Sequence, residues 1–123
     1  MSKEQNKRIR KLKKQADDLW KIKVMEKYGR VCTICPNIAS DPHHYFIKGN
    51  FSNLRYSLEN GVPLCRKHHM DIHNRQDPDV IARIISRRGQ KWHDDLTEQS
   101  KKPAKSWKSI EYYKEIIKKL EAL

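Results

Sequence analysis

The chain has 123 residues, of which 34% are charged and 37% are hydrophobic, and its formal net charge is +12. An apolar fraction this low excludes a large core and predicts one small domain or a compact core with helical extensions, which often needs a metal, a disulfide or a partner chain. The charge predicts a polyanionic partner, above all nucleic acid, although acidic membrane lipids also suit a basic surface. No segment is apolar enough for a membrane span or an export signal, so we expect a cytoplasmic protein, or one in the host cytoplasm if it is viral.

The first predicted element is a helix over residues 4–27, within a basic segment that covers residues 1–30. Residues 1–31 carry eleven lysines and arginines against four acidic residues. One face of this helix can pack on the core or on a second chain, while the lysines are solvated or lie against a DNA backbone. The apolar residues recur at helical spacing, and a glycine that can end the helix follows them: Ile9, Leu12, Ala16, Leu19 and then Gly29.

Residues 31–76 are predicted to form the core of an α+β fold. Turn residues and short apolar runs without a helical period fill residues 32–64. Within them, residues 43–47 and 61–64 favour two short strands joined by a long loop. Residues 66–75 favour a short helix that follows the second strand directly.

Residues 77–123 are predicted to form a C-terminal helical extension. Asp77 followed by Pro78 is typical of a helix start. The expected helices cover residues 78–89 and 90–99 and then, after a break at residues 100–103, the chain from Ser109. The last helix has an apolar stripe that favours packing, either as a cap on the core or as a contact in a homodimer: Ile110, Tyr113, Ile117 and Leu120.

All three cysteines of the chain fall into a pattern of metal ligands. Cys32-x2-Cys35 is followed, after a long gap, by Cys65-x2-His68. In a reducing compartment such spacing is typical of metal binding rather than of a disulfide, and two tight pairs of sulphur and nitrogen ligands suit tetrahedral zinc. The alternative is a buried pair of free cysteines with a coincidental third. We expect a structural Zn²⁺ that contributes directly to folding.

Five of the six histidines fall within residues 43–73, as one adjacent pair and one helical pair. His69 and His73 are four residues apart, so on a helix both lie on one face and can reach a single metal ion. The adjacent pair is His43-His44, on the first predicted strand. This concentration of imidazoles indicates a second metal site beside the cysteines.

The order of these features resembles the HNH, or ββα-metal, endonuclease family. The matching stretches are DPHHYFIKG and ENGVPLCRKHHMDIH, with Cys32-x2-Cys35 ahead of them. One departure is His68, where the commoner zinc-bearing members have cysteine. The resemblance implies a small ββα-metal core with a zinc knuckle, flanked by N- and C-terminal helices, and hydrolysis of DNA phosphodiester bonds.

The family pattern also implies a role for each matching residue. His44 would be the general base, and Asn60 would fix the loop to the first strand so that the ring of His44 points correctly. A divalent ion, Mg²⁺, Mn²⁺ or Zn²⁺, would be held by three imidazoles: His43, His69 and His73. The roles of His43 and His44 could be exchanged, because neighbouring side chains of a strand point to opposite faces.

Two basic residues near these histidines are candidates for DNA binding. Lys48 and Arg55 could each contact the scissile or a flanking phosphate, or each could be a solvated surface charge. The run Leu54-Arg55-Tyr56 followed by Asn60 is similar to phage recombination nucleases of the Rap/NinG kind, which implies branched or recombination-intermediate DNA as substrate. The rival classes are a catalytically inactive, zinc-stabilised DNA-binding module and a zinc hydrolase of small molecules.

Overall fold

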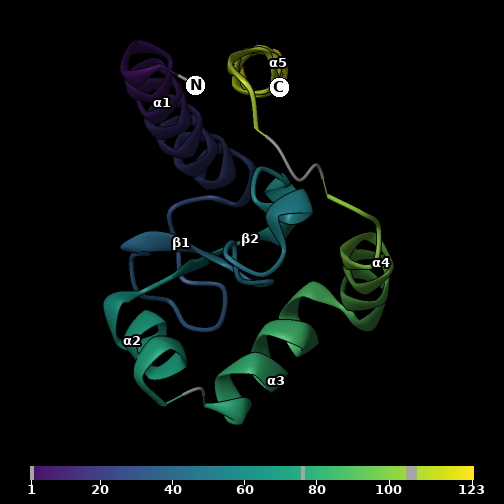
Figure 1. The fold of residues 1–123 in the computed structure, drawn as a ribbon. Coiled ribbons are helices and arrows are strands. Elements are labelled where there is room, and N and C mark those ends of the chain that lie inside the picture. The colour runs from purple at the N-terminus through teal and green to yellow at the C-terminus, as the bar shows by residue number, and fades with distance from the viewer. Residues whose placement is uncertain (1, 76, 105–107) are drawn as a thin grey trace.

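The computed structural model describes residues 2–75, 77–104 and 108–123, and it confirms the predicted α+β class (Figure 1). The predicted end of the core at residue 76 lies outside the described residues. None of the described helices combines the length and the apolar character that crossing a membrane would require. Five α-helices, two short 3₁₀ helices and two strands follow in the order α1 (Lys3–Tyr28), β1 (Asp41–His44), η1 (Ser52–Leu54), η2 (Leu58–Asn60), β2 (Gly61–Leu64), α2 (Arg66–Arg75), α3 (Pro78–Arg88), α4 (Gln90–Ser100) and α5 (Ile110–Glu121).

The helices begin and end close to the predicted residues, because the residues that cap them lie next to the helix ends in the sequence. The hydroxyl of Ser2 accepts a hydrogen bond from the backbone N–H of Gln5, whose side chain accepts one from the N–H of Ser2, so α1 begins with a capping box. Asp77 caps α3 by accepting from the N–H of Asp79. The predicted helices over residues 66–75, 78–89 and 90–99, and from Ser109, are confirmed.

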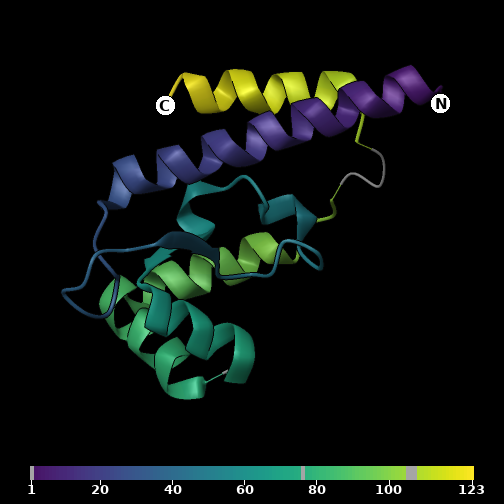
Figure 2. The same cartoon turned by 90° about the vertical axis from the view of Figure 1, so that its left-hand side faces the viewer.

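The two terminal helices, α1 and α5, lie side by side and run in the same direction (Figure 2). The Nζ of Lys23 donates to the carbonyl of Leu123 at 3.1 Å, which ties the end of α5 to the second half of α1. The predicted stripe of α5 therefore packs within the chain, against α1. The residues that this packing buries are Ala16, Trp20, Val24, Tyr113, Ile117 and Leu120.

The two strands form an antiparallel hairpin in which Asp41 pairs with Leu64 and His44 with Gly61. The predicted strand over residues 43–47 is wrong in its bounds, since β1 begins two residues earlier and ends at His44. Beyond that point the side chain of Asn60 takes both backbone groups of Phe46: its Oδ1 accepts from the N–H at 2.7 Å and its Nδ2 donates to the carbonyl at 3.0 Å. A side chain thus replaces the partner strand, and the ladder ends.

The hairpin lies between α1 on one side and α2, α3 and α4 on the other (Figures 1 and 2). On the side of α2 to α4, apolar residues of the hairpin and of the cysteine turn pack against α3. The buried members of this cluster are Cys32, Ile34, Val62, Leu64, Cys65, Val80 and Ile84. Each strand therefore contacts a helix on both faces, which fixes its position for the site described below.

Gly61 lies directly beneath α1, where no side chain would fit. A Cβ at this position would come within 2.5 Å and 2.7 Å of the two methyl groups of Val24 and within 3.1 Å of the Trp20 ring. We expect Gly61→Ala to lower the free energy of unfolding by about 1–3 kcal/mol, because the packed helix has to move. Urea unfolding measures this, with Gly49→Ala as the matched control, since a Cβ at Gly49 meets no atom within 4 Å. Equal stability of the two variants would contradict the close packing.

Candidate active site and metal centres

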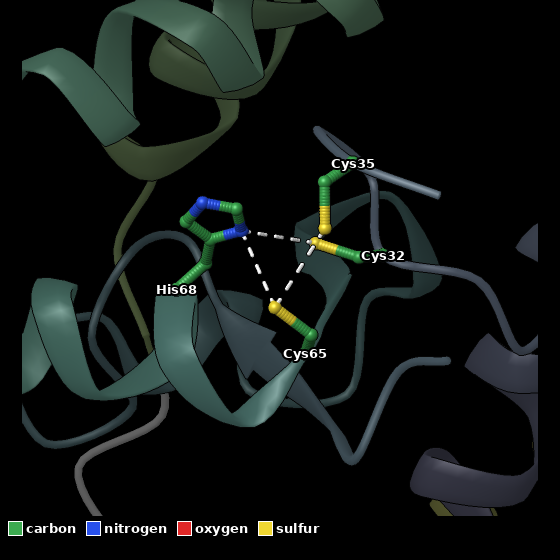
Figure 3. Close-up of side chains that lie close together, drawn as sticks. All are labelled: Cys32, Cys35, Cys65 and His68. Carbon is green, nitrogen blue, oxygen red and sulfur yellow. Dashed lines mark hydrogen bonds between the residues drawn. The ribbon is translucent and has the colours of Figure 1, made fainter. Parts of the chain in front are cut away.

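The four predicted zinc ligands come together in one cluster (Figure 3). Cys32 and Cys35 lie in a turn closed by a bridge between Val31 and Ile38, Cys65 directly follows β2, and His68 is in the first turn of α2. The Sγ atoms of Cys35 and Cys65 are 3.8 Å apart, and the Nδ1 of His68 lies 3.5 Å from the Sγ of Cys32 and 3.3 Å from that of Cys65. Ligands at the corners of a zinc tetrahedron stand about 3.6–3.8 Å apart, as the usual Zn–S and Zn–N bond lengths require. The cluster could therefore hold a metal ion such as zinc.

The protonation of the cysteine cluster also suits a metal. Burial raises the pKa of Cys32, but hydrogen bonds from the backbone N–H groups of Cys65 and Ile34 outweigh it and lower this pKa to about 6. Burial raises the pKa of Cys35. All three cysteines are free thiols. The thiolate that zinc binding needs is thus already favoured at Cys32.

A second group of possible ligands consists of three imidazoles. His43 comes from β1, and His69 and His73 come from one face of α2, so that a ligand nitrogen of each lies within 4.8 Å of the others. The Nε2 atoms of His69 and His73 are 2.9 Å apart. Adjacent nitrogens around one ion with metal–nitrogen bonds near 2.1 Å stand about 3.0–3.4 Å apart, so the three rings fit a single cation. His43, and not His44, belongs to this group.

The three imidazoles line the same pocket, and the surroundings of His43 and His69 favour the neutral form of these two rings. Burial, together with the nearby rings of His73, His69 and His44, lowers the pKa of His43 to about 3. Burial and the neighbouring His73 also lower the pKa of His69. Neutral imidazole is the form that binds metals, so no proton has to leave these two residues at pH 7.

His44 is not one of the three clustered imidazoles, and its ring packs against α1. Its ring stacks on Trp20 with 3.9 Å between ring centroids and 8° between planes, and its Nε2 lies 3.0 Å from the carbonyl oxygen of Arg55. Because a carbonyl only accepts, Nε2 carries the proton and Nδ1 keeps its lone pair. Burial lowers the pKa of His44 to about 4, with a further contribution from the charges of Lys48 and Arg55. The ring is therefore held in one orientation and is neutral at pH 7.

Asn60 is fully buried and uses its whole amide group to hold the loop after β1. In addition to its two bonds with Phe46, its Nδ2 donates to the carbonyl of Leu54 at 3.2 Å. The residue after Leu54 is Arg55, whose carbonyl accepts from His44. Asn60 thus fixes the segment that orients the imidazole without contacting that imidazole itself.

One of the two predicted DNA-binding residues has a different partner in the structure. Arg55 forms a two-point ion pair with Asp17 of α1, at 3.0 Å and 2.9 Å, so its guanidinium is occupied. Burial opposes the charged form of Asp17, yet the hydrogen bonds from Arg55 hold its pKa below the usual value. Arg55 therefore joins α1 to the loop beside His44, and a phosphate contact by this residue stays a prediction.

Lys48, the other candidate, is exposed and lines the pocket that contains all four imidazoles. This pocket has a volume of about 290 Å³. Besides Lys48 and His44 it is lined by Lys21 of α1, by Asp41, Pro42 and Ile47, and by the three clustered histidines His43, His69 and His73. Two lysines thus face the same space as the four rings.

Sequence analysis missed three contributions of α1 to this site. Asp17 is an acidic residue within a basic helix, which indicates an ion pair with a basic residue elsewhere. The sequence does not show that this residue is Arg55. Trp20 lies next to the apolar stripe of this helix and Lys21 contributes to its positive charge, and neither pattern indicates a place in the pocket. Nothing in the spacing of α1 could show that its residues reach the loop after β1, because that contact is made between distant segments.

Comparisons with known proteins give no information on the function of this site. A scan against protein-family models finds no match, and no curated protein and no solved structure is significantly similar to the chain. Membership of the HNH family therefore stays a prediction.

Proposed function

We propose that the protein is a metal-dependent endonuclease of the HNH type that hydrolyses DNA phosphodiester bonds. The observation that carries this proposal is one pocket in which three imidazoles able to share an ion stand beside a fourth imidazole and two lysines. A cation site, a base and positive charge for phosphate are the components that hydrolysis of a phosphodiester by water needs. The formal net charge of +12 supports a polyanionic substrate.

In this proposal His44 accepts a proton from the attacking water. Its Nε2 is engaged by the carbonyl of Arg55, so Nδ1 is the basic atom, and the stacking on Trp20 keeps the ring from turning away. A phosphate bound in the pocket brings negative charge. This charge raises the pKa of His44 toward neutral pH and makes the ring a stronger base. Asn60 keeps the supporting loop in place.

The remaining groups of the pocket bind the substrate and its cation. A divalent ion such as Mg²⁺, Mn²⁺ or Zn²⁺, held by His43, His69 and His73, would stabilise negative charge on the phosphate and on the departing oxygen. Lys21 and Lys48 would bind the same phosphate or its neighbours along the strand.

We assign a structural Zn²⁺ to the cluster of Cys32, Cys35, Cys65 and His68. Such an ion would join the cysteine turn, the end of β2 and the first turn of α2. His68 directly precedes His69, so a zinc ion there would fix the helix that carries two of the three imidazoles. The structural site would in this way support the catalytic one.

The test is cleavage of supercoiled plasmid by purified protein with Mg²⁺ or Mn²⁺. We expect His73→Ala to reduce cleavage by about 100-fold or more, because the ion loses one of three ligands. Asn74→Ala, at the next and exposed position of α2, is the matched control and should cleave like the unmodified chain. Equal loss in both variants, or none in either, would contradict the proposal.

A panel of linear, nicked, forked and four-way-junction DNA then addresses the narrower proposal of branched or recombination-intermediate DNA of a phage. Preferred cutting of the forked or junction substrates supports it, and equal cutting of all four leaves a general nicking enzyme. Binding of every substrate without cutting under any metal condition would instead favour the catalytically inactive, zinc-stabilised DNA-binding module.

A further inference from the structure

A second pocket, of about 450 Å³, adjoins the one that contains His44. The two pockets share His43, Ile47 and His73 as lining residues. The other walls come from the segment after β1 and from α2, α3 and α4, which surround the hairpin on this side (Figure 1). These walls are formed by Tyr45, Phe46, Ile72, Ile81 and His93. Its volume lies in the range of pockets that enclose small organic groups.

The two adjoining pockets differ in charge. The pocket of His44 is lined by Lys21 and Lys48 against one carboxylate, Asp41. A further cavity next to it adds Arg10, Lys13 and Lys14 of α1 against Asp17 and Asp18, so cationic side chains outnumber the acidic ones and phosphates are favoured there. Within the described part of the chain, no lysine, arginine or carboxylate lines the second pocket. An occupant of that pocket is therefore expected to be uncharged, even though it lies directly beside a site for anions.

The second pocket is also aromatic and open at its rim. Phe46 makes edge contacts with Tyr45 and Phe51 at 5.3 Å and 5.0 Å between ring centroids. Ile47 and Ile81 are 58% and 37% exposed, which is unusual for large apolar residues with a cavity between them. The hydroxyl of Tyr45 lies 2.9 Å from the Nδ1 of His93 and adds one polar pair to the walls. Flat, uncharged and partly polar groups suit such a lining.

We infer that the second pocket receives an unpaired nucleobase of the DNA strand whose phosphate is held beside His44. This inference rests on the proposed function and specifies its substrate. A nucleotide joins its uncharged base to its phosphate through one sugar, and the two pockets share a wall. The strand can thus place the phosphate among the lysines and the base among Tyr45, Phe46 and the isoleucines.

The base has to be unpaired because a base inside a duplex is stacked and hydrogen-bonded to its partner. Taking it out costs free energy, and this cost is smallest at a bulge, a mismatch or a single strand. Stacking on an aromatic side chain offsets the cost and depends little on which base is present. The pocket therefore favours DNA with a local break in pairing over uniform duplex, with little sequence preference.

The experiment measures binding and needs no cleavage. Two labelled duplexes are compared by fluorescence anisotropy with the zinc-loaded protein and no other added metal: one has a single-nucleotide bulge, and the other has an abasic residue in that bulge. We expect binding of the bulge with a base to be roughly tenfold tighter, as the stacking of one base predicts. Ile81→Trp, which fills the pocket from its rim, should abolish the difference. Ile38→Trp is the matched control, because Ile38 is 81% exposed and lies outside the pocket.

Equal binding of the two duplexes overturns the inference, and so does a preference that survives in Ile81→Trp. The same duplexes are then incubated with Mn²⁺ to follow cutting. Tighter binding of the duplex with the base, without any cutting, would support the base-binding pocket and contradict the nuclease activity. Cutting without a difference in binding would support the nuclease activity and contradict the base-binding pocket. Failure to bind either duplex would reject both.

Discussion

Replacing His44 with alanine is expected to reduce plasmid cleavage by about 100-fold to 10,000-fold, the contribution that a general base makes to such reactions. The expected loss is large because, among the described imidazoles of the pocket, His44 alone would be left free of the ion. In the proposed site, His43, His69 and His73 would use their lone pairs for the ion. The measurement is the initial rate of plasmid nicking in Mn²⁺.

The same variant should still bind DNA and keep its fold. His44 makes one hydrogen bond and one ring stack, and it lies outside the three apolar clusters that hold α1 to α5 and the hairpin to α3. Anisotropy with labelled DNA and the circular-dichroism spectrum check this. Undiminished cutting by a highly purified His44→Ala protein would remove His44 from the role of base.

Replacing Cys65 with alanine is expected to lower the free energy of unfolding by more than about 3 kcal/mol, because the binding of a structural zinc ion is itself folding free energy. Cys65 is buried in the apolar cluster that contains Val62, Leu64 and Ile84. The group of four possible zinc ligands is thus connected to the hairpin and α3 as well as to α2. Thermal melting and the zinc content per chain measure the effect. His73→Ala, in contrast, should keep the melting temperature, since His73 is exposed.

Cobalt substitution separates the two centres in these variants. Only the cysteine cluster can give thiolate-to-cobalt charge-transfer absorption, because the second group contains imidazoles alone. We expect Cys65→Ala to weaken this absorption strongly and His73→Ala to leave it intact. Unchanged melting, metal content and absorption in Cys65→Ala would disprove the structural zinc site.

The ligand clusters could be predicted from sequence because their geometry is mostly local. Cys32 and Cys35 share one tight turn, and His69 and His73 are one helical turn apart, so each pair is formed by the spacing itself. The helix caps are equally local, and so α3 begins at Pro78 as expected. The α+β class followed from the same periodicities.

The rest depends on contacts between distant segments, which a periodic pattern does not reveal. The end of β1 at His44 is set by the side chain of Asn60, sixteen residues further along the chain. The orientation of His44 depends on Trp20, and the occupation of the Arg55 guanidinium depends on Asp17, both on α1. The apolar pocket gathers residues of β1 and the segment after it, of α2, of α3 and of α4, and no periodic pattern shows that these elements meet.

The pairing of α1 with α5 has a consequence for the order of events during biosynthesis. The ring beneath His44 belongs to Trp20, and Trp20 packs in the same cluster as Leu120 of α5. The ribosome releases α1 long before it releases α5. The apolar side of α1 that packs against α5 therefore stays exposed until α5 has been synthesised. The packing around the Trp20 ring that supports His44 is complete only when α5 docks, whereas the two groups of possible metal ligands, which lie between α1 and α5 in the sequence, can assemble earlier.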